Sequence, residues 1–239
     1  NLGISLSAVG RPIEAIEAYK KVLQLKPDLK EAFLGLGNTY WQLNRTEEAA
    51  QAFQNALKLD ATYSDAAVNL AEIQNDEATL QTLARQNPQD ARSFYYLGRR
   101  KFAEKKYKEA LPYLQQADKL QQSDEIKIML GETLLALQNN SDALSVFYAA
   151  FQLNPHNAAA ALHIADLETE NQNFGEAEKY YKKSLELNPD NVQTHANYAN
   201  ILCKRKRTLE ALEEYRAAVR LAPEQPELSY NLAIILKTL

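Results

Sequence analysis

The chain has little cysteine, and it has no long hydrophobic run. Its 239 residues include one cysteine, Cys203, so an internal disulfide framework is excluded. That usage favours a reducing compartment such as the cytoplasm, although a periplasmic repeat protein would share it. No apolar stretch approaches the roughly 18 residues that span a bilayer, so a transmembrane helix is not expected.

Sequence motifs for nucleotide binding, metal binding or catalysis are equally scarce. The segment "GLGNTY", with Gly35 and Gly37, lacks the third glycine and the preceding strand of a nucleotide-binding loop. The only histidines are His156, His163 and His195, and no cysteine or carboxylate stands at metal-ligand spacing from them. No serine or cysteine has a recognisable base and orienting group. We therefore expect no catalytic, cofactor or metal site.

The charge balance argues against a nucleic-acid partner, because the net charge is −4. Two basic runs occur, at residues 99–108 and at residues 204–207, the second reading "KRKR". The second run looks like a nuclear-import signal or an anion patch. It also falls where a helix ends, and cations are favourable there. We interpret it as a solvated turn.

A period of 34 residues organises the chain. Pro155, Pro189 and Pro223 are 34 residues apart, and each closes a similar phrase. In the unit that ends at Pro189, the first half has apolar residues at helical spacing, a polar turn "NQNFGE" follows, and a second helical pattern ends at the proline. Asp190 or Asn191 can cap the next helix. Such a unit cannot bury its apolar face alone, so copies must stack.

These units resemble the tetratricopeptide repeat, which requires a small residue at position 8, alanine at 20 and an aromatic residue at 24. Position 8 holds Gly3, Gly37, Ala71, Gly98, Gly131, Ala165, Ala199 and Ala233. Position 20 holds Ala15, Ala49, Ala110, Ala143, Ala177 and Ala211. Position 24 holds Tyr19, Phe53, Leu114, Phe147, Tyr181 and Tyr215. Small residues let paired helices touch, and the ring fills the gap beside them.

The resemblance implies an all-α, right-handed α-solenoid of stacked helix–turn–helix units. The predicted units are 1–29, 30–63, 64–90, 91–123, 124–157, 158–191, 192–225 and 226–239. Unit 1–29 lacks its start and unit 226–239 is a first helix only. The chain also begins with Asn1, so we expect a segment of a longer protein. Unit 64–90 is about seven residues short, its position-20 alanine cannot be assigned, and its second helix should be short. Two other folds are excluded. Prolines and turns interrupt the heptad run that a coiled coil needs, and the alternating pattern of β-strands does not occur.

The resemblance also implies that the first helices line a concave groove in which positions 2, 5, 6, 9 and 12 face a partner. Position 6 holds Asn1, Gly35, Asn69, Tyr96, Met129, His163, Asn197 and Asn231. The asparagines are similar to the asparagine ladder of O-linked N-acetylglucosamine transferases, where such amides can grip a peptide backbone. The alternative is that each asparagine bonds within its own solenoid. Asn38 and Asn200, at position 9, extend the candidate set.

Aromatic and arginine side chains cluster on one first helix. Arg92, Tyr95, Tyr96 and Arg99 occupy positions 2, 5, 6 and 9 of unit 91–123, and this composition is typical of binding hot spots. Inter-repeat packing is the alternative for some of the tyrosines. The candidate partner-binding residues are Asn38, Asn69, Arg92, Tyr95, Tyr96, Arg99, Asn197, Asn200 and Asn231.

Three functions fit this reading. The first is a non-catalytic scaffold that binds a protein or peptide segment in the concave groove. The second is the substrate-recruiting arm of a larger enzyme such as a glycosyltransferase, and the third is an assembly scaffold of a bacterial secretion or envelope complex. Self-association through uncapped terminal repeats is a further expectation.

The sequence predicts that the chain does not hold the free carboxylate at the end of a peptide. Family members that bind chaperone tails use a clamp of asparagines and cations. Here Asn38, Asn69 and Arg92 match the clamp, but Leu34 and Tyr96 replace two of its cations. A peptide with a free C-terminal carboxylate should therefore bind no better than its amidated twin in fluorescence anisotropy. Micromolar binding that is lost on amidation would contradict this prediction.

Overall fold

The computed structural model describes residues 5–6 and 9–238, and over this part of the chain the fold is all-α with no strand. Asn1, Gly3 and Leu239 lie outside the described residues. The helices form two compact units, here called unit 1 (Asn1–Glu104) and unit 2 (Lys105–Leu239). The division falls inside the predicted repeat 91–123. No helix in the described ranges is both long enough and apolar enough to cross a membrane.

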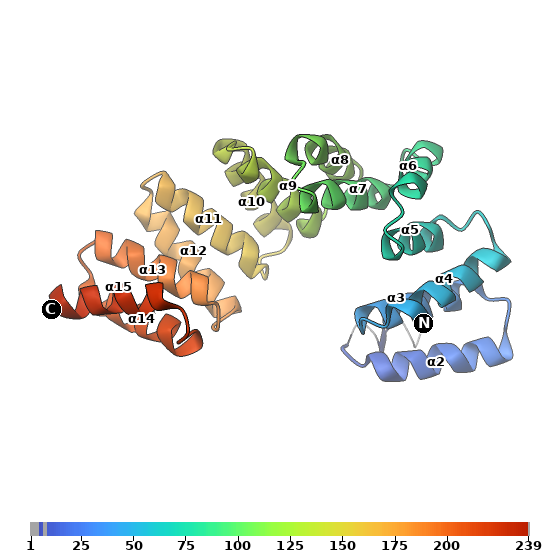
Figure 1. Cartoon of the computed structure of the whole chain (residues 1–239), viewed down its shortest axis with the longest axis horizontal. Helices are drawn as coiled ribbons and strands as arrows, with labels where there is room; N and C mark the ends of the chain where they lie inside the picture. The colour runs from blue at the N-terminus through green and yellow to red at the C-terminus, as the bar shows by residue number, and fades with distance from the viewer. Residues whose placement is uncertain (1–4, 7–8, 239) are drawn as a thin grey trace. The chain divides into compact units, whose positions relative to one another are not determined.

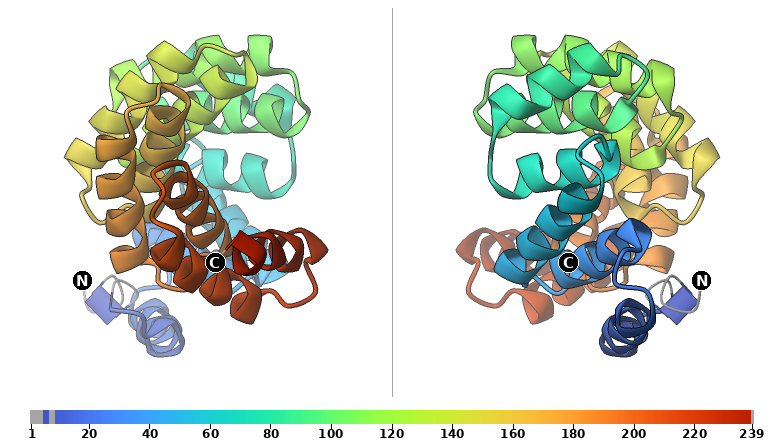
Figure 2. Two further views of the ribbon diagram at one scale, coloured as in Figure 1. Left: turned by 90° about the vertical axis from the view of Figure 1, so that its left-hand side faces the viewer. Right: turned by 90° about the vertical axis from the view of Figure 1, so that its right-hand side faces the viewer.

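Among the described residues, the helices alternate between first and second helices of the predicted repeats. The first helices are α3 (Lys30–Gln42), α5 (Ser64–Ile73), α7 (Ala91–Ala103), α9 (Asp124–Ala136), α11 (Ala158–Glu170), α13 (Val192–Lys204) and α15 (Pro226–Thr238). The second helices are α2 (Pro12–Leu25), α4 (Thr46–Leu59), α6 (Glu77–Gln86), α8 (Tyr107–Leu120), α10 (Asn140–Leu153), α12 (Phe174–Leu187) and α14 (Thr208–Leu221). Within each unit, every helix packs against the helix before it and the helix after it (Figures 1 and 2).

The helix ends follow from local chemistry. Each turn between the paired helices contains one residue with left-handed backbone, such as Asn44 with φ 57°. The amide of the next residue, Arg45, then donates to the Tyr40 carbonyl at 2.9 Å, which closes the helix with a Schellman bond. Between repeats, the Asn191 side chain accepts from the Thr194 amide at 2.8 Å, so Asn191 rather than Asp190 caps α13.

The small residue at position 8 packs directly on the ring at position 24. A methyl group added to Gly37 would lie 2.5 Å from the Phe53 ring, and one added to Gly131 would lie 2.5 Å from the Phe147 ring. Both rings are fully buried. All six alanines at position 20 are fully buried as well. These contacts match the packing reason for the predicted pattern.

Repeat 64–90 is seven residues short because both of its helices are shorter than those of repeat 30–63. α5 and α6 have ten residues each, three fewer than α3 and four fewer than α4, while the connecting turns keep their lengths. The fourth residue of α6, which is the alanine position elsewhere, is Leu80, and the eighth, the aromatic position, is Ala84. Both are buried. The large and small residues are therefore exchanged in this repeat, which explains why its alanine could not be assigned.

Enlarging the small residue at position 8 should destabilise unit 2. We expect Gly131→Ala to lower the free energy of unfolding by about 1–3 kcal/mol, because the new methyl group overlaps the immobile Phe147 ring. Gly175→Ala is the matched control, since no atom lies within 4 Å of its added methyl group, and it should be neutral or stabilise by up to about 1 kcal/mol. Urea denaturation measures both. Equal effects at the two glycines would contradict the packing account.

Candidate functional site

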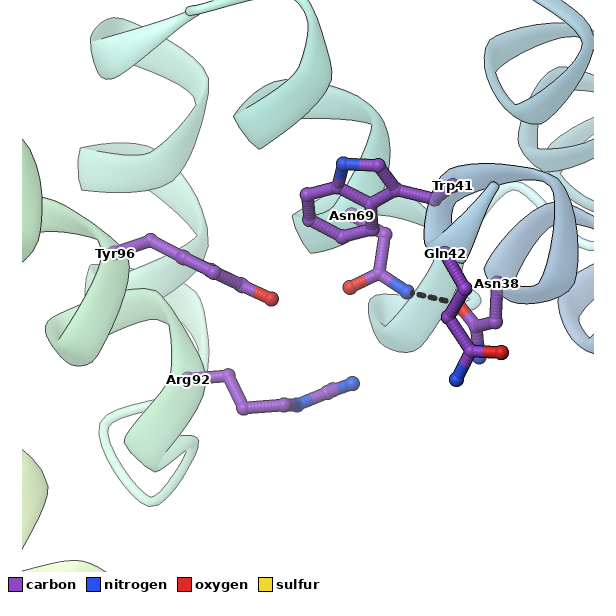
Figure 3. A pocket seen from close by; sticks show the side chains of 6 residues that line it. All are labelled: Asn38, Trp41, Gln42, Asn69, Arg92 and Tyr96. Atoms are coloured by element: carbon purple, nitrogen blue, oxygen red, sulfur yellow. Dashed lines mark hydrogen bonds between the residues drawn. The ribbon is translucent and has the colours of Figure 1, made fainter. Parts of the chain in front are cut away.

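A cavity of about 480 Å³ opens on the first helices of unit 1, and we call it the unit 1 cavity. Its lining comes from three helices, with Asn38, Trp41 and Gln42 from α3, Asn69 from α5, and Arg92 and Tyr96 from α7 (Figure 3). The structure thus gathers four of the predicted site residues around one space. Sequence reasoning did not select Gln42, which lies one position beyond the groove positions considered.

The shortened α5 explains why this cavity has aromatic walls. α5 ends at Ile73, so it has no residue at position 12, where α3 carries Trp41. The Trp41 ring and the Tyr96 ring of α7 therefore approach one another, with 6.2 Å between their centroids. Trp41 is fixed from behind by an edge-on contact with Phe53 at 6.5 Å. The deletion in repeat 64–90 therefore brings the two rings together at one edge of the cavity.

Two amide side chains form the floor of the unit 1 cavity. The Asn69 Nδ2 donates a hydrogen bond to the Asn38 Oδ1 at 2.8 Å (Figure 3). Asn69 is buried, with 6% of its surface exposed, so this bond fixes its orientation. Figure 3 shows the Asn69 oxygen on the side of Tyr96 and Arg92. The pair leaves one carbonyl oxygen and one amide nitrogen with no other hydrogen bond among the described residues.

The arginines of α7 are already paired with carboxylates from the preceding repeat. The Arg92 Nη2 donates to Asp65 at 2.5 Å, and its Nε lies 3.4 Å from Asp90. Arg99 pairs with Glu72, and its guanidinium lies 5.1 Å from the centre of the Tyr96 ring. Three carboxylates thus balance two guanidinium groups beside the cavity, which therefore presents no net positive charge.

Tyr95 lies apart from the cavity lining. Its exposed fraction is 8%, and its ring packs against the Tyr96 ring with 5.5 Å between centroids. A buried ring offers little area to a partner. Of the two tyrosines, Tyr96 lines the cavity and Tyr95 supports it from behind.

Two of the three predicted asparagines of unit 2 lie around a second cavity, of about 600 Å³, which we call the unit 2 cavity. Asn197 and Asn200, both on α13, line it. The Tyr215 hydroxyl donates to the Asn200 Oδ1 at 2.6 Å, and Asn231 of α15 interacts with the same hydroxyl. Asn231 therefore contacts Tyr215 and does not belong to the described lining of either cavity.

Position 6 of one first helix bonds to position 9 of the preceding first helix at several junctions. The Asn69–Asn38 bond is one case, and the Asn197 Nδ2 donates to Asp166 at 2.7 Å in another. His163 and Glu132 form a third such pair at 3.4 Å. The alternative interpretation, in which the asparagines bond within the solenoid, describes Asn197 on both sides of its amide, because its Oδ1 also accepts from the Gln193 Nε2 at 2.7 Å. In the Asn69–Asn38 pair, the Asn69 Oδ1 and the Asn38 Nδ2 have no other hydrogen bond among the described residues.

The basic run at residues 204–207 is tied to one carboxylate of the preceding repeat. Glu178 on α12 accepts from Arg205, from Arg207 at 2.6 Å and from Lys182 at 2.8 Å. Burial raises the pKa of Glu178, but the bonds from Arg207 and Lys182 outweigh burial and lower it to about 2. Both arginines of this run therefore have an internal partner. In the described residues, no three His, Cys, Asp or Glu side chains converge to hold a metal ion.

Comparisons with known proteins agree with this architecture. The tetratricopeptide repeat model matches residues 1–67, 64–125 and 128–192, and a second model of the repeat matches residues 180–213. Human tetratricopeptide repeat protein 7B is 29% identical over 179 residues, which cover 64% of this chain and 21% of that protein. The type IV pilus assembly protein PilF of Pseudomonas aeruginosa is 26% identical over 166 residues, covering 65% of this chain and 66% of PilF.

Solved structures share the fold. A chain of the APC/C hetero-tetramer Cut9–Hcn1 superposes with a TM-score of 0.78 at 18% identity, covering 98% of this chain and 48% of that chain. The Pseudomonas aeruginosa PilF structure gives 0.76 at 22% identity, covering 85% of this chain and 96% of PilF. The chain thus spans about a fifth of protein 7B, about half of the Cut9–Hcn1 chain and about two thirds of the matched PilF sequence.

Stacked helical hairpins with cavities on their first helices define an α-solenoid scaffold. The chain belongs to the tetratricopeptide repeat family, since the family models cover most of its length. Such repeats indicate a protein-interaction scaffold.

The Glu178 network should make the stability of unit 2 depend on pH in the acid range. Because the folded pKa of about 2 lies below the ordinary value of about 4.3, the ionised carboxylate stabilises the fold above pH ~4.3. That contribution is lost as the pH falls towards 2. We expect Glu178→Gln to lower the unfolding free energy at pH 7 by about 1.5–3 kcal/mol, with a smaller difference below pH 4.

Glu176→Gln on the same helix is the matched control for Glu178→Gln. Glu176 is half exposed and pairs only with Lys179 one turn away, so its loss should cost under about 1 kcal/mol. Urea denaturation between pH 3 and pH 7 compares the two variants. Equal losses would show that the Glu178 network adds nothing.

Proposed function

We propose that the chain is a non-catalytic interaction module, and that the unit 1 cavity binds an extended segment of a partner protein. The observation that carries this proposal is the composition of the cavity, where Trp41 and Tyr96 stand beside Arg92 and a pair of amides. Tryptophan, tyrosine and arginine dominate binding hot spots. Tryptophan and tyrosine bury large areas at small entropic cost, and the planar arginine guanidinium can form several hydrogen bonds. The lining side chains of the cavity are carried by three packed helices, and side chains held on helices lose less freedom when a partner binds.

The amide pair suits the backbone of an extended peptide. A peptide N–H can donate to the Asn69 Oδ1, and a peptide carbonyl can accept from the Asn38 Nδ2. These are the groups that the internal Asn69–Asn38 bond leaves unused. Backbone contacts of this kind give affinity without demanding a particular sequence.

The rings and charges around the cavity set its side-chain preference. The faces of Trp41 and Tyr96 favour an apolar or aromatic side chain of the partner. A carboxylate gains little there, because Asp65 and Asp90 already surround the Arg92 guanidinium. This charge balance supports the prediction that a free C-terminal carboxylate is not held.

A second candidate function is assembly of a bacterial secretion or envelope machine. The similarity to PilF, which is named for type IV pilus assembly, favours it. Under this proposal the same first-helix surfaces would bind components of the machine. Restoration of pilus assembly by this chain in Pseudomonas aeruginosa lacking PilF would support it, and failure of a stably expressed chain would oppose it.

The unit 1 cavity can be tested with a matched pair of charge variants. Gln42 lies at the cavity rim on α3, and Gln51 is exposed on the second helix α4. Gln42→Arg should place a long cation over the cavity and weaken binding at least about tenfold, which is about 1.4 kcal/mol. Gln51→Arg adds the same charge elsewhere and should leave binding unchanged.

The probe for this test is a set of linear peptides selected on the wild-type chain from a displayed random library. Fluorescence anisotropy then measures each selected peptide against both variants. Selective loss with Gln42→Arg supports the proposed site. Equal binding to both variants, or a library that yields no binder, would contradict it.

A further inference from the structure

The unit 2 cavity differs from the unit 1 cavity in charge. It lies between α11 and α13, and Asp166 and Glu170 bring two carboxylates to its lining. Lys204 is the one cation among its described lining residues. The Lys204 Nζ lies 5.9 Å from the centre of the Phe174 ring and forms no ion pair with a described carboxylate. Glu170 is exposed at the rim, whereas Asp166 is half-buried in the wall.

Asp166 is held in a fixed orientation with one oxygen unused. The Tyr181 hydroxyl donates to its Oδ1 at 2.6 Å, and the Asn197 Nδ2 donates to the same oxygen at 2.7 Å. The Oδ2 takes part in no hydrogen bond among the described residues. Burial raises the pKa of Asp166, and the bonds from Tyr181 and Asn197 do not fully offset that effect. The carboxylate is therefore partly desolvated and has no cation bound to it.

The neighbouring charges do not supply that cation. His163, one turn earlier on α11, forms no hydrogen bond with Asp166, because its ring is engaged elsewhere. The ring stacks on Phe147 with 4.4 Å between centroids, and its Nε2 lies 3.4 Å from Glu132. Among the described residues, the Lys204 ammonium has no ion pair with Asp166 and lies over the Phe174 ring instead.

Unit 1 shows how this repeat position pairs when a cation is present. Glu72 occupies position 9 of α5, as Asp166 occupies position 9 of α11. The guanidinium of Arg99, from the next first helix, binds Glu72. At the corresponding junction in unit 2, the next first helix has Asn200 at the position of Arg99, and Asp166 is bonded instead by the neutral amide of Asn197. The cation that completes the pair in unit 1 is therefore missing from this chain in unit 2.

We propose that the unit 2 cavity binds a basic side chain of a partner polypeptide, with the guanidinium or ammonium group on the Asp166 Oδ2. Asn200 and Thr169, which also line the cavity, can accept further hydrogen bonds from it. The cavity volume of about 600 Å³ is ample for an arginine side chain. This site lies in the other unit from the proposed peptide site, and its ligand chemistry is independent of that site.

A pair of capped tripeptides that differ only in charge tests the proposal. The probes are acetyl-Ala-Arg-Ala-amide and the same tripeptide with citrulline, which keeps the shape of arginine but is neutral. Titration into the ¹⁵N-labelled chain is followed by NMR. We expect saturable shifts at residues 166, 170, 197 and 200 with the arginine peptide, and at least about tenfold weaker binding with citrulline.

Two variants check the role of the carboxylate. Asp166→Asn can still accept from Tyr181 and Asn197, so it should stay folded and bind the arginine peptide about tenfold more weakly. Lys204→Gln removes the competing cation without touching those bonds, and it should tighten binding about threefold. Gln42→Arg, in unit 1, should leave this binding unchanged, which separates the two sites.

Three results would overturn the proposal. They are equal binding of the citrulline peptide, unchanged binding by a folded Asp166→Asn variant, and shifts that map away from α11 and α13. A loss of arginine binding in Gln42→Arg would also count against it, because the effect would then belong to the unit 1 cavity. Weaker binding of the arginine peptide by Lys204→Gln would also contradict the proposal, because removing a competing cation should strengthen binding.

Discussion

Where position 24 is aromatic, the contact between that ring and the small residue on the paired first helix sets how closely the two helices approach. At Gly37 and Gly131 there is no room for even one methyl group before the Phe53 and Phe147 rings. At three junctions, position 6 of a first helix then lies within hydrogen-bonding reach of position 9 of the first helix before it. The side-chain hydrogen bonds Asn69–Asn38 and Asn197–Asp166 form at that spacing. The cavities lie beside these bonds, between neighbouring first helices.

The two cavities show how one repeat plan yields different surfaces. In unit 1, shortening α5 brings Trp41 and Tyr96 together, and arginines from α7 neutralise the carboxylates of α5. In unit 2, α11 and α13 have thirteen residues each, and α13 has Asn200 where α7 has Arg99. Asp166 is consequently left with amide and hydroxyl partners only. Small departures from the repeat pattern therefore carry more information about binding than the pattern itself.

Much of the fold follows from the sequence, because the constraints that build it are local or recur every 34 residues. Prolines, turn residues and small residues at position 8 predicted the all-α fold, and the structure confirms it. The exchange of Leu80 and Ala84 could not be predicted, since it depends on how two shortened helices realign. The seven missing residues were visible in the sequence, but their division between α5 and α6 was not.

The candidate site was less accessible to sequence reasoning, because its contacts join residues about 30 positions apart. The repeat positions predicted that Asn38, Asn69, Arg92 and Tyr96 share one surface. They could not show that the Tyr96 ring lines the cavity while the Tyr95 ring is buried. Nor could it show that Arg92 and Arg99 are already paired. The most direct test of the account is a crystal structure of the chain with a selected peptide bound. The account predicts the peptide in contact with Trp41, Arg92 and Tyr96, and a peptide bound only to the second helices would contradict it.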